Sequence, residues 1–351
     1  CTEGRRTMTN TEFLNAHQRR AGRRVSALRV LARSVLLVAL PACNSPRVTD
    51  LGAAGTTPTP APASSPTPAP SPTPSGAISC PADPTTAFPA MWINGADCTT
   101  ESPMQVFRYD ANTWIVRQSM CTNFEGPFLY LLFGQDKALL EDTGAGNVDV
   151  AGTIQPIVQT WLSENGKTSI PLVVVNSHGH GDHISGNSAL AALPNTTLVG
   201  TSVAQVQQFF GIANWPTDTA SIDLGGRVVD VVPIPGHQTA HIALYDHGTG
   251  WLMTGDTLYP GRLYVSDFPS YVASIQRLVD FTADKTVCNV MGTHIEMTST
   301  PKQDFAYQST YHPGEHKLPL TRAHLLELND AVKAMQNAPV QEAHDDFIIV
   351  P

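Results

Sequence analysis

The sequence lacks a long hydrophobic run. The apolar stretch in its N-terminal part, residues 34–40, is only about seven residues long, whereas a helix needs roughly twenty apolar residues to span a bilayer. A transmembrane helix is therefore excluded at this position. Six arginines lie between positions 19 and 33, and Leu40, Pro41, Ala42 and Cys43 end the apolar stretch. A basic segment followed by a short apolar one predicts a secretory signal.

The residues before Cys43 define this signal further. A small residue, Ala42, precedes the cysteine, and Leu40 lies three positions upstream of it. This spacing resembles the lipobox of bacterial lipoproteins, in which the cysteine is lipidated after cleavage. The resemblance implies an exported cell-envelope protein that faces the periplasm or the cell exterior and meets the membrane through its lipid anchor only. An ordinary cleaved signal and a fortuitous match are the alternatives.

Large apolar side chains are also missing from residues 56–74, which consist of Pro, Thr, Ala and Ser. Such a segment cannot bury enough surface to offset the entropy lost when its backbone is ordered. We expect a semi-rigid, extended spacer. The predicted organisation is a signal peptide with lipobox at 1–43, a disordered linker at 44–79 and one catalytic domain at 80–351.

Positive charge is scarce after the signal. Residues 1–43 contain eight basic and two acidic residues, which leaves 13 basic and 28 acidic residues in the remainder of the chain, a net charge of −15. An acidic body repels phosphate backbones. The composition therefore argues against a nucleic-acid partner and favours a small-molecule substrate.

Cysteine is sparse, with six residues in the whole chain. Apart from Cys1 and Cys43, an even number remains, which predicts two disulfides in an oxidising compartment, with three alternative pairings. We expect Cys80 to pair with Cys98 because they are close in sequence. Buried free thiols are the alternative. The four cysteines are Cys80, Cys98, Cys121 and Cys288.

Strand and helix patterns interleave in the predicted domain, which indicates sheets covered by helices. Residues 171–175 form a β-branched run typical of a strand that is buried on both faces. Apolar runs and periodicity place the remaining elements. We expect further strands at 128–133, 137–140, 197–199, 227–233, 242–245, 251–254 and 287–291, and helices at 154–162, 202–210, 270–281 and 322–335.

A dense group of polar residues follows the strand at 171–175. Three histidines and one aspartate lie within six positions, separated by glycines, in the order His178, His180, Asp182 and His183. In an extended segment His178 and His180 point the same way and can bind one ion. Asp182 and His183, after the turn that Gly181 permits, can face a second ion. The H-x-H-x-D-H pattern therefore predicts metal binding rather than ordinary polar residues.

Three later residues stand where apolar runs end, and each follows a glycine by one or two positions. They are His237, Asp256 and His294. Nitrogen and oxygen donors without cysteine suit zinc, with iron or manganese as alternatives where carboxylates contribute. Together with the histidine cluster, these residues supply enough donors for two ions.

The motifs of this chain, taken in their order along the sequence, resemble those of the metallo-β-lactamase superfamily. The resemblance extends from about Phe128 to about His294 and implies an α+β fold, a four-layer αβ/βα sandwich with metals at one edge. It implies one site from His178, His180 and His237, a second from Asp182, His183 and His294, and Asp256 bridging both. The motifs are Glu141-Asp142-Thr143-Gly144, the histidine cluster, Gly236-His237, Thr254-Gly255-Asp256 and Gly292-Thr293-His294.

Asp256 stands where the β-lactamases of this superfamily usually have Cys or Ser, so the chain is more similar to the glyoxalase II, lactonase and phosphodiesterase branches. The basic residues that glyoxalase II uses for glutathione are not recognisable. We expect a hydrolase of esters, thioesters or lactones that uses a hydroxide bridging two zinc-type ions. A β-lactam hydrolase and an iron-dependent sulfur dioxygenase are the alternatives.

Four residues receive further expected roles. Asp182 could orient the hydroxide as well as bind metal, and Tyr259, at a spacing similar to the acyl-homoserine lactonases, could donate to the developing oxyanion. A packed aromatic side chain is the alternative for Tyr259. Asp142 and His241 resemble family positions that orient ligand histidines. The histidines of the loop at 311–316, His312 and His316, are expected at the surface; the alternative is that this polar loop borders the substrate cleft.

Overall fold

The computed structural model describes residues 78–81, 87–336 and 338–351. The expected signal peptide with Cys43 and almost all of the expected linker lie outside the described residues. Among the described helices, none combines the length and apolar character needed to cross a membrane.

The first sheet has six strands in chain order. Its first four strands are antiparallel neighbours, and β4, β5 and β6 run parallel. The strands are β1 (Met104–Asp110), β2 (Thr113–Gln118), β3 (Phe128–Phe133), β4 (Ala138–Glu141), β5 (Leu172–Val175) and β6 (Thr196–Leu198).

The second sheet also has six strands, in the order β13-β12-β10-β9-β8-β7. Strands β8 and β10 flank the antiparallel β9, and β12 runs parallel to β10, so β8, β10 and β12 all point the same way. The strands are β7 (Ala220–Asp223), β8 (Val228–Pro233), β9 (Ile242–Asp246), β10 (Trp251–Gly255), β12 (Asn289–Gly292) and β13 (Pro319–Leu320). A third sheet joins β11 (Arg262–Tyr264), β15 (Ile348–Val350) and β14 (Glu342–Ala343).

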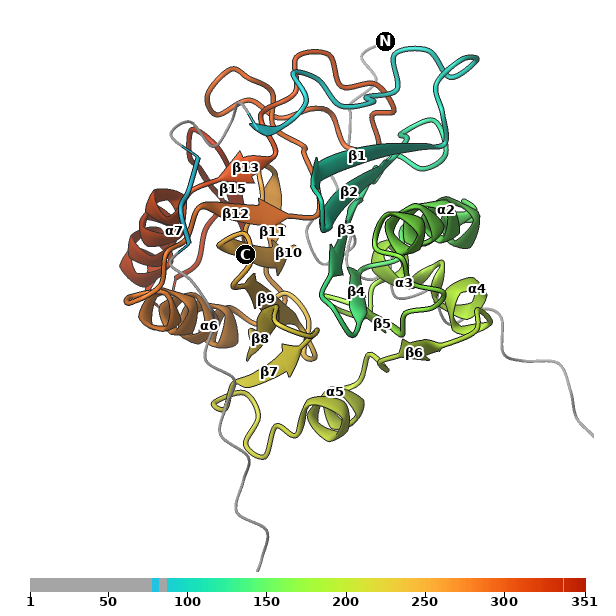
Figure 1. Cartoon of the computed structure of the whole chain (residues 1–351). Coiled ribbons are helices and arrows are strands. Elements are labelled where there is room, and N and C mark those ends of the chain that lie inside the picture. The colour runs from blue at the N-terminus through green and yellow to red at the C-terminus, as the bar shows by residue number, and fades with distance from the viewer. Residues whose placement is uncertain (1–77, 82–86, 337) are drawn as a thin grey trace, which may run out of the picture. The chain divides into compact units, whose positions relative to one another are not determined.

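Helices cover the outer faces of the two large sheets, as Figure 1 shows. The green helices α2 and α4 lie on the first sheet, and the orange and red helices α6 and α7 lie on the second. The four layers confirm the expected α+β sandwich. The helices are α2 (Val150–Glu164), α3 (Gly181–Ile184), α4 (Asn187–Ala191), α5 (Val203–Phe210), α6 (Phe268–Phe281) and α7 (Arg322–Met335).

Strand β3 shows how the sequence specifies these layers. All six of its residues are buried, and successive side chains point to opposite faces. Tyr130 and Leu132 enter the core between the two sheets, whereas Leu129 and Leu131 pack beneath α2. A strand that is buried on both faces needs a continuous apolar run, which is the pattern of residues 128–133.

The expected Cys80–Cys98 disulfide is wrong. Cys80 pairs with Cys288, and Cys98 pairs with Cys121. The segment at 78–81 lies against the turn before β10, where Ile78 and Cys288 both approach Gly250. Closeness in sequence failed because the fold brings Cys80 beside a residue 208 positions away.

Candidate metal centre

Five strands end at the same edge of the two sheets, and a predicted site residue follows each of them. Asp142 comes directly after β4, and the histidine cluster comes after β5. His237, Asp256 and His294 follow β8, β10 and β12. Because these three strands point the same way, their carboxyl ends meet at one edge, where ligand sites of sheet proteins commonly form.

Backbone hydrogen bonds hold the two sheets together at this edge. The amide of Ile242 donates to the carbonyl of Ser177 at 2.9 Å, and the amide of Phe128 donates to the carbonyl of Thr293 at 2.8 Å. The loops that carry the donors are therefore fixed to one another by main-chain contacts. Such fixation keeps a polar site in one geometry.

The glycine before Asp256 is required by close packing. Gly255 has a φ of +51°, which favours glycine, and a Cβ there would lie 2.5 Å from His241 Nε2 and 2.8 Å from Ser177 Cβ. The turn out of β10 therefore passes directly against the histidine loop. This contact explains why a glycine precedes Asp256 in the sequence.

Three imidazole nitrogens converge at one point, and we call His178, His180 and His237 the three-histidine group. His178 Nε2 lies 2.9 Å from His180 Nδ1 and 3.2 Å from His237 Nε2. His180 Nδ1 lies 3.0 Å from His237 Nε2. Three nitrogens at such distances can offer one ligand atom each to a single cation.

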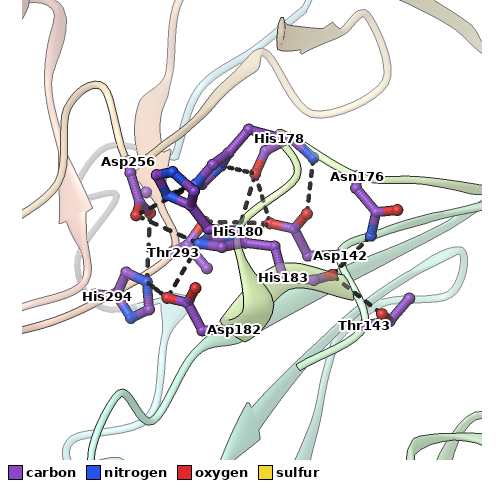
Figure 2. Close-up of polar contacts among 12 residues, drawn as sticks. Asp142, Thr143, Asn176, His178, His180, Asp182, His183, Asp256, Thr293 and His294 are labelled. Carbon is purple, nitrogen blue, oxygen red and sulfur yellow. Dashed lines mark hydrogen bonds and ion pairs between the residues drawn. The ribbon is translucent and has the colours of Figure 1, made fainter. Parts of the chain in front are cut away.

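Four further residues, Asp182, His183, Asp256 and His294, converge beside the first group and are here called the mixed group. Asp256 Oδ2 lies 3.3 Å from His183 Nε2, and Asp256 Oδ1 lies 3.3 Å from His294 Nε2. Asp182 Oδ2 lies 3.4 Å from His183 Nε2 and 3.5 Å from His294 Nε2. Figure 2 shows these four side chains pointing toward one another.

Asp256 also faces the three-histidine group. Its Oδ2 atom lies 3.6 Å from His237 Nε2 and 3.8 Å from His178 Nε2. The same carboxylate thus lies between both donor groups. This is the placement that a bridging ligand requires.

The donor atoms fit a pair of cations. His183 Nε2, His294 Nε2 and Asp256 Oδ1 are buried and have no hydrogen-bond partner among the described residues. Buried polar atoms are nearly always satisfied, so atoms that approach to 3.3 Å without hydrogen bonding indicate a shared third partner. Imidazole and carboxylate donors without sulfur suit zinc, iron or manganese.

The other nitrogen of two ligand histidines faces a backbone carbonyl. His237 Nδ1 lies 2.7 Å from the carbonyl oxygen of Tyr264, and His294 Nδ1 lies 2.9 Å from that of Glu125. A carbonyl can only accept, so Nδ1 carries the proton in both rings. With a cation bound, each Nε2 would direct its lone pair into the centre, which is the usual arrangement of ligand histidines.

Asp142 orients the remaining buried histidines. Its Oδ2 atom accepts from His183 Nδ1 at 2.8 Å and from the Ser177 hydroxyl at 2.9 Å. Because the Ser177 hydroxyl donates to Asp142, it can accept from His178 Nδ1, which lies 3.1 Å away. One carboxylate thus fixes His183 directly and His178 through Ser177, as Figure 2 shows for Asp142.

Burial and charge shift the histidine pKa values of the two groups in opposite directions. Burial, with His183 nearby, lowers the pKa of His178 well below its ordinary value. Burial alone would also lower the pKa of His183, but the carboxylates of Asp256 and Asp182 outweigh it and raise this pKa well above the ordinary value. The same balance raises the pKa of His294. Before a cation binds, the three-histidine group therefore contains neutral imidazole, whereas the mixed group retains protons.

A family model described as the metallo-β-lactamase superfamily matches residues 124–294. The chain contains a metallo-β-lactamase superfamily domain. The matched residues begin just before β3 and end at His294, so they include every residue of both donor groups.

Several curated relatives of this domain are hydroxyacylglutathione hydrolases. The one from Aeromonas hydrophila is 33% identical over 118 residues, which cover 32% of this chain and 45% of the relative. The one from Thermosynechococcus vestitus is 34% identical over 151 residues, which cover 40% of this chain and 56% of the relative. The chain thus spans about half the length of these relatives. A solved metallo-β-lactamase from Pontibacter korlensis aligns with 66% of this chain and 99% of its own, at 19% identity and a TM-score of 0.44.

Two further predicted residues, Tyr259 and His241, lie near the donor groups, and the Tyr259 ring is 5.5 Å from that of His294. The Tyr259 hydroxyl donates to the carbonyl of Arg262 at 2.5 Å and lies 3.0 Å from Glu296 Oε2. To donate a hydrogen bond to an oxyanion, the Tyr259 hydroxyl would have to break its contacts with both of these acceptors. His241 makes no hydrogen bond to a ligand histidine among the described residues, and its ring packs 4.6 Å from the ring of His178. Its Nδ1 lies 3.3 Å from the Thr257 hydroxyl.

Sequence reasoning missed three residues around the candidate metal centre. Ser177 directly precedes the histidine cluster but received no role, although a hydroxyl beside the first ligand was a usable signal. Glu125 and Tyr264 act through backbone carbonyls, which every residue possesses, so no side-chain pattern could reveal them. The expected surface position of His312 is wrong, because its side chain is buried and stacks on Phe305 at 4.0 Å.

Proposed function

We propose that the chain is a metal-dependent hydrolase that uses two zinc-type cations to cleave small ester, thioester or lactone substrates. The convergence of seven donors into two groups that share Asp256 supports this proposal most strongly. Two adjacent cations of this kind supply a water that ionises near neutral pH and polarise a substrate carbonyl.

The chain's own residues have distinct tasks in this reaction. Asp182 is the more exposed of the two carboxylates in the mixed group, with 21% of its side chain accessible against 9% for Asp256. Asp182 is therefore placed to accept a hydrogen bond from an incoming water. Asp142 and the carbonyls of Glu125 and Tyr264 hold the histidine rings in one tautomer, so no reorientation is needed during the reaction.

The relatives favour thioesters within the proposed substrate class. Hydroxyacylglutathione hydrolases are named for an acyl group joined to glutathione, and the superfamily match at residues 124–294 includes both donor groups. Recognition of the leaving group depends on regions outside this shared centre. Glutathione itself is therefore not part of the proposal.

We also propose that the protein is exported and lipid-anchored through Cys43. Two disulfides in the described domain support an oxidising compartment. Expression of the full chain in a bacterium, followed by separation of membranes from soluble proteins, tests the anchor. Wild type should remain with the membranes, and the Cys43→Ser variant should not acquire lipid. A lipid-free wild type would contradict the proposal.

Metal analysis and a substrate screen test the proposed activity. The purified full chain should bind about two zinc ions and hydrolyse at least one of a set of lactones, thioesters and aryl esters. One bound iron ion together with sulfur oxidation would favour the dioxygenase alternative, and turnover of β-lactams alone would favour the lactamase alternative. Asp330→Asn, on an exposed position of α7, is the control for substitutions at the centre.

A further inference from the structure

The short helix α3 carries two ligands of the mixed group. It contains only four residues, Gly181–Ile184, and these include Asp182 and His183. The last four carbonyls of any helix have no partner inside that helix, so the carbonyls of a single turn need donors from elsewhere. His183 is fully buried, and its carbonyl must therefore find a donor inside the protein.

Two residues from neighbouring strand ends donate to this carbonyl. Asn176, which follows β5, donates from Nδ2 to the His183 carbonyl at 2.7 Å. The amide of Thr143, which lies two residues after the end of β4, donates to the same oxygen at 2.8 Å. Figure 2 shows the side chains of Asn176 and Thr143 directed at the His183 backbone. Because a carbonyl can only accept, the Asn176 atom that faces it is the amide nitrogen.

A second asparagine closes these contacts into a ring. Asn176 Oδ1 accepts from Asn187 Nδ2 at 2.8 Å, and Asn187 Oδ1 accepts from the Thr143 hydroxyl at 2.9 Å. The Thr143 hydroxyl also lies 3.1 Å from the His183 carbonyl oxygen. Each contact fixes the orientation of the next side-chain amide. We call Thr143, Asn176 and Asn187 the carbonyl clamp.

The residues after α3 donate back to the segment that follows β4. The Ser185 amide donates to the Gly144 carbonyl at 3.1 Å, and the Gly186 amide donates to the Thr143 carbonyl at 3.0 Å. A Cβ on Gly186 would lie 2.7 Å from the Thr143 carbonyl oxygen, so the two segments pack as closely as glycine permits. The α3 turn is thus held by hydrogen bonds that run in both directions.

The clamp acts on the backbone of a ligand whose ring is already oriented. Asp142 Oδ2 accepts from His183 Nδ1 at 2.8 Å, whereas the clamp holds the His183 carbonyl. Asp182 lies on the same turn, so a shift of α3 would move two ligands of the mixed group together. The three-histidine group has no ligand in α3. The contacts of the clamp therefore bear on one of the two donor groups.

We propose that the carbonyl clamp positions the α3 turn, so that Thr143, Asn176 and Asn187 increase the affinity of the mixed group for its cation without contacting that cation. The inference rests on the proposed two-cation function. Ligands that are held in place before binding lose little ordering entropy when the cation arrives. Supporting hydrogen bonds around metal ligands typically change metal affinity 10 to 100-fold, and we expect about tenfold for Asn176.

Replacement of Asn176 by leucine tests this positioning. Asn176→Leu keeps a side chain of similar size and removes its hydrogen bonds. Asn94→Leu is the matched control, because Asn94 is also 5% exposed and also donates from Nδ2 to a histidine carbonyl, that of His312, at 3.0 Å. Competition with a chelating dye measures both zinc affinities, and the mixed-group ion is the one that His180→Ala leaves in place.

The two variants should differ in which ion they weaken. Asn176→Leu should weaken the mixed-group ion about tenfold and leave the three-histidine ion unchanged. Asn94→Leu should lower the free energy of unfolding but leave both zinc affinities unchanged. Equal weakening of both ions in Asn176→Leu, or the same selective loss in Asn94→Leu, would overturn the positioning role.

Thr143 allows a test by conservative rescue. Thr143→Val keeps the shape of the side chain and removes the hydroxyl, whereas Thr143→Ser keeps the hydroxyl and removes a methyl group. The valine variant should weaken the mixed-group ion about threefold, since one hydrogen bond of the ring is lost. The serine variant should bind that ion as wild type does. A side chain that only fills space predicts the reverse order, and that order would contradict the proposal.

Hydrogen exchange of the metal-free protein gives a readout that needs neither metal nor turnover. The Ser185 and Gly186 amides should exchange about tenfold faster in Asn176→Leu and unchanged in Asn94→Leu. If wild type cleaves no substrate but the variants show these differences, the hydrolase function fails and the positioning role stands. If wild type cleaves esters, and Asn176→Leu retains both the zinc affinities and the slow exchange, the hydrolase function stands and the positioning role is overturned.

Discussion

The two donor groups of the metal centre differ in how the charges and lone pairs of their own donor atoms are balanced when no cation is bound. The three-histidine group brings three ring nitrogens within 2.9 to 3.2 Å of one another, and the Asp256 carboxylate lies farther away, 3.6 Å from His237 and 3.8 Å from His178. The mixed group alternates imidazole with carboxylate, so a retained proton partly compensates its charges. The first group therefore needs a cation to balance lone pairs, whereas in the second a cation replaces protons.

The comparison also shows where the groups are joined. Asp256 lies between them, and Asp142 supports one histidine of each. The remaining supports are separate, because His237 depends on the Tyr264 carbonyl and His294 depends on the Glu125 carbonyl. Substitutions at the shared residues should affect both ions, and changes at the separate supports should affect one.

Removal of Asp256 should have the largest effect. Asp256→Ala deletes the carboxylate that faces both groups, so we expect at least one of the two ions to be lost and turnover to fall about 1,000-fold or more. His180→Ala should weaken only the three-histidine group. Metal content by mass spectrometry and hydrolysis rates with the best substrate measure both effects. An Asp256→Ala protein that keeps two ions and full turnover contradicts the shared-ligand geometry.

Asp142→Ala should have the next largest effect. The change leaves His183 Nδ1 and the Ser177 hydroxyl without their acceptor, and loss of such supporting hydrogen bonds typically lowers metal affinity 10 to 100-fold. Ser177→Ala interrupts only the path to His178, so its effect should be smaller and confined to the three-histidine group. Competition with a chelating dye gives both affinities. Equal effects of the two substitutions would show that Asp142 does not reach both groups.

The sequence predicted the strands that lead to the site better than the rest of the sheets. Runs such as 171–175 and 251–254 are apolar and end in polar motifs, so their positions agree with β5 and β10 within one residue. Strand β1 was missed because it lies at a sheet edge, where alternate residues are exposed. Strands of two or three residues, such as β13 and β14, are too short to show any periodicity.

The ligand side chains could be predicted from the sequence, whereas the groups that hold these side chains in place could be predicted only in part. All seven predicted ligands converge in the structure. Asp142 has a recognisable position, but the carbonyls of Glu125 and Tyr264 have no residue-type signal. The disulfides were mispaired because their partners meet only after the two sheets have packed.

The metal affinity of the mixed group should fall by about tenfold for each unit by which the pH is lowered, whereas that of the three-histidine group should change little. The raised pKa values of His183 and His294 mean that these rings still hold protons at neutral pH, and a cation must displace them. As pH falls, binding to the mixed group should weaken, because proton displacement becomes harder. Burial lowers the pKa of His178 and of His237, so binding to the three-histidine group should change little between pH 8 and 6.

Calorimetric titration in two buffers with different ionisation enthalpies measures this proton release directly. The first equivalent of zinc should release few protons and the second should release more. Asp330→Asn serves again as the control. Equal proton release for both equivalents would mean that the two groups titrate alike and that their electrostatic difference is not expressed in solution.

The two disulfides should give the smallest and most selective effect on metal binding. The Cys98–Cys121 bond lies four residues before Glu125, whose carbonyl holds His294, so its replacement by two serines should weaken the mixed-group ion a few-fold. The Cys80–Cys288 bond closes a far longer loop, with a sequence separation of 208 against 23, and its loss should lower the free energy of unfolding more. Zinc affinity and urea unfolding of the two double-serine variants measure the two effects. If both variants lose stability and metal affinity in the same proportion, the β2–β3 loop supports the mixed group no more than any other part of the fold does.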